Sequence, residues 1–240
     1  MNRSRYPIPV NELERLEALR EYDQLDSGAE QATDDIVEIA SHVCNVPIAI
    51  VVLLDENRQW FKAKKGLTVS ETPREDAFCA HTTMTHQTMV VPDATLDERF
   101  LNNPLVTGDP KIRFYAGAPL IAGEGHILGT LCVINDRPQE LTKAQQEVLE
   151  ALARQVVTHF ELRRTSKRMA DSLRKIQLLE SLLPICGWCK KARDDKGYWS
   201  ELESYLVKQR GLTLSHGICP ACVKAHFPPH PHPTSPARNG

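Results

Sequence analysis

The sequence lacks long apolar segments. The longest apolar run, at 46–54, has nine residues and includes a proline, whereas a membrane-spanning helix needs about 20. No apolar stretch follows the two arginines near the N-terminus, so we expect no secretory signal. With 41% hydrophobic and 25% charged residues, the composition is that of an ordinary globular protein. These features predict a cytoplasmic protein with no membrane partner.

A large net charge is also absent, since the formal value is −2, but the charge is unevenly distributed. Residues 1–162 contain 15 Lys and Arg against 25 Asp and Glu, and residues 163–240 contain 14 against 6. This asymmetry suggests two modules, with an acidic partner for the second one. The alternative interpretation is a solvated basic helix.

Periodicity predicts an α+β fold with a central antiparallel sheet and flanking helices. Apolar residues recur at helical spacing in 10–21 and 27–43. The segments 47–54, 59–65, 88–91, 113–121 and 127–135 have the composition of strands, and their short connections favour antiparallel pairing. We expect a long ordered loop at 96–110. The predicted organisation is an N-terminal helix at 1–23, an α+β domain at 24–162, a helical linker at 163–183, a cysteine-bearing module at 184–227 and a disordered tail at 228–240.

One long helix is predicted over 142–183, because no Pro or Gly interrupts the segment before Pro184. Its second half carries Leu162, Met169, Leu173, Ile176 and Leu183 near 3.5-residue spacing. An apolar stripe on so long a helix needs a partner, so we predict a homodimer through this helix. A helix that folds back as a hairpin is the alternative.

The cysteine-bearing module contains two CxxC pairs, Cys186/Cys189 and Cys219/Cys222. Four thiolates in this pattern bind Zn²⁺ tetrahedrally, and four such ligands leave no open position for catalysis. A turn and a short helix between the pairs, followed by a helix that starts at Cys219, favour a treble-clef-like arrangement. His216 is an alternative ligand. A module of about 45 residues buries little core, so structural zinc would supply much of its stability.

A second constellation centres on Cys79 and His81. Two residues at this spacing in a strand would face the same side and therefore one cavity. Such a cavity would suit an anionic ligand, a metal or a covalently attached cofactor, whereas the competing interpretation is that Cys79 simply fills the core. The candidate pocket residues are Trp60, Phe78, Cys79, His81, Asp93, Arg99, Phe114 and Tyr115.

The segment 24–162 resembles a bacterial GAF domain. The resemblance lies in VPIAIVVLLDENRQWFKAKKGL, ETPREDAFCAHT, VVPDATLDERFLNNPLVTG, and IRFYAGAPL followed by GHILGTLCVIN, in the family's order and spacing. It implies a sensory module with a pocket for a small, unknown ligand and dimerisation through flanking helices. Bilin-binding relatives attach the chromophore to a cysteine followed directly by histidine, or to a cysteine in a separate loop motif, whereas Ala80 separates Cys79 from His81 here. LLPICGWCKKARDDKGYW and SHGICPACV are similar to a small module found behind PAS, GAF or receiver domains.

Motifs of an output enzyme are missing: we find no G-x-G ATP lid, no Gly-Gly-Asp-Glu-Phe motif and no P-loop. The sequence therefore predicts a non-enzymatic bacterial signalling protein with no catalytic residue, in which a GAF domain relays ligand or partner binding through a helix to a zinc module and an unknown partner protein. One alternative is a redox or metal sensor that uses Cys79 and His81. Another is a nucleic-acid-binding regulator that uses the basic residues Arg163, Arg164, Lys167, Arg168, Arg174 and Lys175.

Overall fold

A computed structural model describes residues 6–180, 184–194, 196–211, 213, 215 and 217–226. The chain divides into two compact units, Met1–Ser172 and Leu173–Gly240. The predicted tail at 228–240, the end of the predicted helix at 181–183 and the alternative ligand His216 lie outside the described residues.

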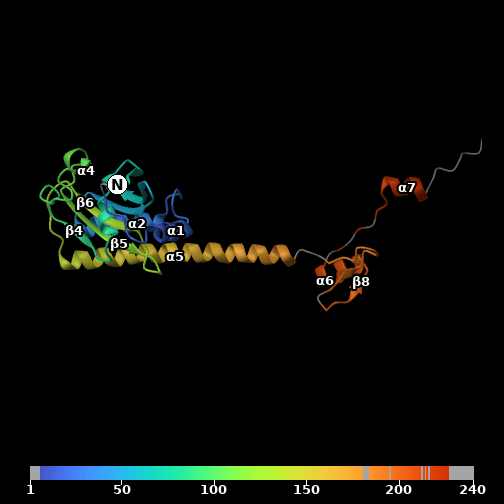
Figure 1. Cartoon of the computed structure of the whole chain (residues 1–240). Helices are drawn as coiled ribbons and strands as arrows, with labels where there is room; N and C mark the ends of the chain where they lie inside the picture. Colours follow the sequence, from blue (N-terminus) through green and yellow to red (C-terminus); the bar gives the residue numbers. More distant parts are fainter. Residues whose placement is uncertain are drawn as a thin grey trace, which may run out of the picture. The chain divides into compact units, whose positions relative to one another are not determined.

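The first unit is built on a six-stranded sheet in the order β3-β2-β1-β6-β5-β4 (Figure 1). Its strands are β1 (Ile48–Leu54), β2 (Arg58–Lys65), β3 (Glu71–Pro73), β4 (Met89–Val91), β5 (Phe114–Ile121) and β6 (Ile127–Asn135). Every pair of neighbouring strands is antiparallel. The predicted α+β class, an antiparallel sheet flanked by helices, is confirmed.

Three helices cover one face of this sheet: α1 (Glu12–Glu21), α2 (Gln31–Cys44) and the first half of α5 (Lys143–Glu180). Side chains from alternate positions of β1, Ala49, Val51 and Leu53, pack there against Val37 of α2 and Val156 of α5 in one buried cluster. The uninterrupted apolar sequence of β1 follows from burial on both faces, because each successive side chain points to the opposite side.

The other face is covered by shorter elements. They are η1 (Arg74–Asp76), α3 (Phe78–Thr82), α4 (Pro104–Thr107) and the loops around α4. Ile50 and Val52 of β1 point to this side and pack with Phe78 and Tyr115. Short helices and loops therefore form a roof over this face of the sheet. The cavity described below lies between this roof and the sheet.

Three local features differ from the sequence-based expectation. The segment around Cys79 and His81 is the helix α3 and not a strand, the loop predicted at 96–110 contains the short helix α4, and β3 adds an edge strand that we did not predict. Each of these elements has at most five residues, so hydrophobic periodicity carries little signal for them.

The second unit contains the hairpin β7 (Ala192–Arg193) and β8 (Trp199–Ser200), followed by α6 (Leu202–Arg210) and α7 (Pro220–His226). Pro220 starts α7, where a missing backbone N–H costs nothing. None of the helices in the described ranges has the length and apolarity to cross a membrane.

Candidate functional site

An apolar cavity of about 290 Å³ lies between the sheet and its irregular roof. β1 and β6 supply the floor with Ile50, Val52, Cys132 and Ile134, and α3 contributes Phe78. The mouth is bordered by two segments: residues 67–72, which reach into β3, and residues 105–112, which begin in α4. The remaining lining residues are Ile48, Gln59, Phe61, Leu67, Thr68, Val69, Thr72, Cys79, Leu105, Asp109, Pro110, Ile112 and Tyr115.

Ionisable groups inside the cavity are held neutral by burial. Loss of solvation raises the pKa of Cys79 and of Tyr115, and it raises the pKa of Cys132 to about 12. The Cys79 thiol donates to Gln59 Oε1 at 3.1 Å, and Gln59 Nε2 donates in turn to the hydroxyl of Thr72. A thiol with a raised pKa is a poor nucleophile, which weakens the redox-sensor alternative.

Three of the eight predicted pocket residues line this cavity: Phe78, Cys79 and Tyr115. The structure does not bring the other five to it. Trp60 and Phe114 belong to the cluster on the opposite face of the sheet. Successive residues of a strand alternate between faces, so Phe61 and Tyr115 line the cavity while their neighbours Trp60 and Phe114 do not.

His81 does not share the cavity with Cys79, and the expectation that both face one side is wrong. Residues two apart in a helix point in nearly opposite directions, and the segment forms α3. The half-buried His81 ring meets Phe100 edge-on, with the ring centroids 4.9 Å apart. Loss of solvation, followed by the charge of Arg99, lowers its pKa. The two residues therefore do not form one redox or metal site.

Asp93 and Arg99 also lie apart from the cavity and stabilise loops. Asp93 Oδ1 accepts hydrogen bonds from the backbone N–H and the hydroxyl of Thr95, at 3.0 and 2.7 Å. Arg99 pairs with Asp97 at 2.6 Å. The hydrogen bond from Arg99 lowers the pKa of Asp97. Local turn capping explains these polar residues without a ligand.

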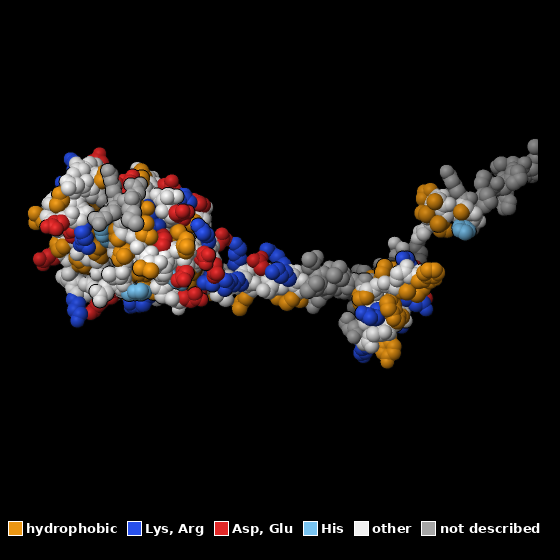
Figure 2. All heavy atoms as spheres, in the orientation of Figure 1, with side chains coloured by type: hydrophobic (Ala, Val, Ile, Leu, Met, Phe, Trp, Pro, Cys, Tyr) orange, Lys and Arg blue, Asp and Glu red, His pale blue; other side chains and the backbone are white. Residues whose placement is uncertain are grey.

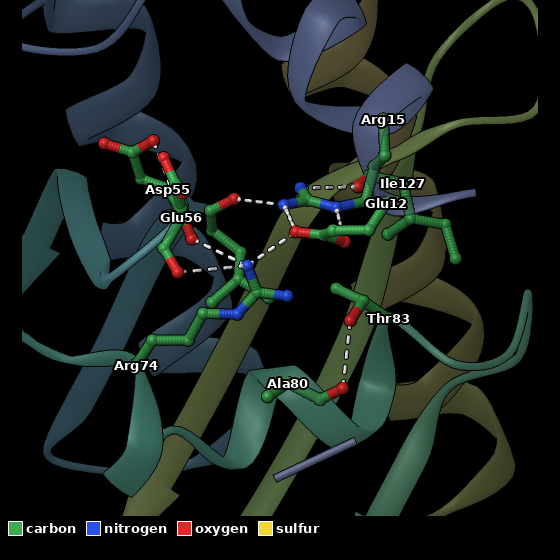
Figure 3. A network of polar contacts seen from close by, with 9 residues as sticks. Glu12, Arg15, Asp55, Glu56, Arg74, Ala80, Thr83 and Ile127 are labelled. Carbon is green, nitrogen blue, oxygen red and sulfur yellow. Dashed lines mark hydrogen bonds and ion pairs between the residues drawn. The ribbon is translucent and has the colours of Figure 1, made fainter. Parts of the chain in front are cut away.

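A buried ionic network, which sequence analysis missed, connects the roof of the cavity to α1 (Figure 3). Glu12 accepts hydrogen bonds from Arg15 Nε at 2.8 Å, Arg15 Nη2 at 2.7 Å and Arg74 Nη1 at 2.6 Å. Arg15 also donates to the backbone of Leu54, and Arg74 to that of Asp55. The two arginines are 1% and 2% exposed. Because η1 runs directly into α3, this network joins α1 to the helix that carries Phe78 and Cys79.

A second set of polar contacts joins α1 and the following loop to α5. The Tyr22 hydroxyl donates to Glu161, and Arg164 pairs with Glu21 at 2.6 Å. Lys167 pairs with Asp23 in the same region. Figure 2 shows acidic and basic side chains gathered where α5 leaves the sheet.

These contacts bear on the nucleic-acid alternative. Among the basic residues invoked for it, Arg163, Arg164, Lys167 and Arg168 are ion-paired with carboxylates of the same chain. A side chain that already has a carboxylate partner offers less charge to a phosphate.

A third polar cluster lies beside the β-bulge of β2. Lys62 has no partner in the β1–β2 register, and its buried ammonium donates to Ser27 Oγ at 2.7 Å, to the Gly28 carbonyl at 2.9 Å and to Glu30. Glu30 also accepts a hydrogen bond from His159 of α5 at 2.6 Å. Burial acts to raise the pKa of Glu30, but Lys62 and the other donors outweigh it, so the pKa is lowered. Sheet, loop and α5 are thereby held together.

The cysteine-bearing module presents each CxxC pair as free thiols at a turn or a helix start. The backbone N–H of Cys186 donates to the Lys191 carbonyl at 2.8 Å, and that of Lys190 to the Cys186 carbonyl at 3.0 Å. Backbone N–H groups, those of residues 189 and 188 first, lower the pKa of Cys186, and that of residue 222 does the same for Cys219. Within the part of the chain that the structure describes, no three metal-ligating side chains gather into one site. The zinc site stays a prediction.

Comparison with known proteins identifies the family. The sequence model of the GAF domain matches residues 28–160. The chain belongs to the GAF domain family. This membership supports a role in bacterial sensing and signal transduction.

Two solved GAF structures resemble the fold. The blue-light absorbing form of the Thermosynechococcus elongatus PixJ GAF domain superposes with a TM-score of 0.50 at 15% identity, covering 70% of this chain and 98% of that one. The GAF domain of an Acinetobacter phosphoenolpyruvate-protein phosphotransferase gives a TM-score of 0.46 at 21% identity, covering 65% and 98%. At this identity the PixJ likeness shows the fold alone.

A Pseudomonas aeruginosa protein named cyclic di-GMP phosphodiesterase is 41% identical over 161 residues. This finding contradicts the prediction of a non-enzymatic protein, because the relative is named as an enzyme. The match covers 67% of this chain and 27% of the relative, so the chain corresponds to about a quarter of that protein's length.

Proposed function

We propose that this protein is a sensor in which the GAF cavity binds a small molecule and α5 carries the response to the cysteine-bearing module. The observation that carries this proposal is the position of the cavity: it lies on one face of the sheet, and α1 and α5 pack on the other. A ligand on one side can therefore influence the helix that leaves the domain on the opposite side.

The proposed route runs through the two ionic networks. A ligand that contacts Phe78 or Cys79 would change the position of α3, and with it the position of η1, which precedes α3 in the chain. Arg74 of η1 is bonded to Glu12 of α1, and Glu21 at the other end of α1 is bonded to Arg164 of α5. A ligand that binds better to one arrangement of these contacts shifts the population of α5 toward that state.

A second copy of the chain is the proposed partner of α5. Among the side chains of α5 that the structure describes, Leu162, Met169, Leu173 and Ile176 follow a heptad-like spacing and are 50–65% exposed. Sedimentation equilibrium of the full chain should give a dimer. Leu173→Asp should shift it to monomer, whereas Lys175→Asp, on another face of the helix, should not. A wild-type monomer at micromolar concentration would contradict the dimer.

Structural zinc in the cysteine-bearing module is the proposed cofactor, with Cys186, Cys189, Cys219 and Cys222 as ligands. The free thiols, the knuckle-like turn at Cys186 and the helix start at Pro220 support it. Elemental analysis should find one zinc per chain, and Cys219→Ser should lose it. Cys44→Ser, in the other unit, is the matched control. Zinc-free protein purified without chelator would refute this assignment.

The sensor proposal is tested by ligand capture and hydrogen exchange. Small molecules that co-purify with the full chain are released by denaturation and identified by mass spectrometry, then added back to protein that has been freed of them. We expect altered amide exchange in α3 and in residues 162–172 of α5. The change in α5 should be lost in Glu12→Gln and kept in Glu14→Gln, which alters an exposed residue of the same helix. If saturation with the captured ligand changes amide exchange nowhere in the described part of α5, the proposed relay from the cavity to α5 is refuted.

A further inference from the structure

The charge of the cavity wall indicates which ligands it accepts. Among the lining residues that the structure describes, none is Lys, Arg or His, and Asp109 is the one acidic residue. Asp109 is exposed and lies at the mouth. The interior therefore offers no cation to an anionic ligand. At the edge of the cavity the Lys64 ammonium is engaged by the carbonyls of Thr68 and Val69, at 2.7 and 2.6 Å, and Lys64 is not part of the lining.

Neutral polar groups inside the cavity are few and mostly engaged with one another. The Gln59 side chain is bonded through its oxygen to the Cys79 thiol and through its nitrogen to Thr72. The Tyr115 hydroxyl lies 3.2 Å from that of Thr82. A ligand rich in hydrogen-bonding groups would lose its hydration without replacing it, which is costly in an apolar site.

The cavity volume gives a size limit. About 290 Å³ is near the lower end of the range for ligand pockets, roughly 300–1,000 Å³. A bulky dianion such as cyclic di-GMP, the compound in the name of the Pseudomonas relative, is mismatched in both size and charge.

We infer that the cavity selects a small, neutral, predominantly apolar molecule and rejects nucleotides and other anions. This inference rests on the proposed sensory function, because it names the ligand class of the same cavity. The principal contacts are the aliphatic side chains of β1 and β6 and the ring of Phe78.

A matched pair of probes separates the charge of a ligand from its apolar surface. 1-Octanol and octanoate have the same chain length and differ in the head group. Titration calorimetry of the full chain should give one site for 1-octanol, with octanoate at least about 100-fold weaker because its carboxylate has no cationic partner. Titration with cyclic di-GMP should give no heat of binding that differs between the wild type and Leu67→Trp. Leu67→Trp, a change in a half-buried residue at the mouth, should abolish 1-octanol binding while circular dichroism stays that of the wild type.

A charge introduced at the mouth provides the converse test. Val69 lines the cavity and is 48% exposed, so we expect Val69→Lys to fold like the wild type and to add a cation. This variant should bind octanoate at least about tenfold more tightly than the wild type does. Leu96→Lys is the matched control, since Leu96 is 81% exposed and is not part of the lining. An unchanged octanoate affinity in Val69→Lys would overturn the charge argument.

The outcomes distinguish this inference from the proposed function. If octanoate or cyclic di-GMP binds as tightly as 1-octanol and Leu67→Trp abolishes that binding, the ligand class is wrong and the sensory cavity stands. If no probe binds, the ligand class is likewise overturned, and the sensory role is decided by the hydrogen-exchange experiment. Selective, Leu67-dependent binding of 1-octanol supports the inference.

Discussion

Replacing Glu12 with Gln tests the ionic network beneath the cavity roof. The substitution keeps the size of the side chain and removes its charge, which leaves Arg15 and Arg74 buried without their shared counter-ion. Breaking a buried ion pair from one side costs about 3–5 kcal/mol. Because Arg15 keeps the Leu54 carbonyl at 2.7 Å and Arg74 keeps that of Asp55 at 2.9 Å, we expect a loss near the lower end, about 3 kcal/mol.

Tryptophan fluorescence provides the assay for the GAF domain alone. Trp60 is 8% exposed and lies in the core of this domain, whereas Trp188 and Trp199 belong to the cysteine-bearing module. Urea unfolding is therefore followed in a Trp188→Phe, Trp199→Phe background. Glu14→Gln, on the exposed side of the same helix, should change the free energy of unfolding by less than about 0.5 kcal/mol. An equally small effect of Glu12→Gln would refute the argument.

The effect of Glu12→Gln should depend on pH. Burial acts to raise the pKa of Glu12, but the hydrogen bonds and charges of Arg15 and Arg74 outweigh it and hold the pKa below its usual value of 4.5. A carboxyl group with a lowered pKa stabilises the folded state above its unfolded pKa, and this contribution disappears as the pH falls through its folded pKa. The difference between the wild type and Glu12→Gln should be full at pH 7 and should shrink below pH 4.5. A constant difference across this window would show that the charge of Glu12 is not its source.

Two further substitutions test the packing of the sheet. Lys62→Met removes the three hydrogen bonds of a buried ammonium and should lower the free energy of unfolding in urea by about 2–4 kcal/mol, whereas Lys65→Met, at a surface ion pair, should cost less than about 1 kcal/mol. A Cβ atom at Gly129 would lie 1.9 Å from the Val52 carbonyl oxygen, so Gly129→Ala should lower the melting temperature measured by circular dichroism by more than about 10 °C. Gly28→Ala, with no atom within 4 Å of the added Cβ, should leave it nearly unchanged, and equal melting temperatures for the two alanine variants would contradict the close approach.

The sequence by itself determined the long, periodic elements and the family. The apolar run at 47–54 predicted a buried strand, and β1 is covered on both faces because helices pack on one side and the α3 roof on the other. The segments that became β2, β4, β5 and β6 were predicted from their strand-type composition and from the short connections between them. The GAF resemblance was confirmed by the family match to residues 28–160.

Only the tertiary structure decided which polar and sulfur-containing residues meet. The Cys79 segment has five helical residues, too few for periodicity to distinguish a helix from a strand. Because the segment is a helix, His81 points away from the cavity that Cys79 lines. Glu12 and Arg74 are 62 positions apart in the sequence, so no local sequence pattern predicts that they pair. Likewise the bulge that frees Lys62 from the ladder depends on the register between two strands. Contacts of this kind are fixed by how elements pack together, whereas periodicity reports only the environment of each element along its own length.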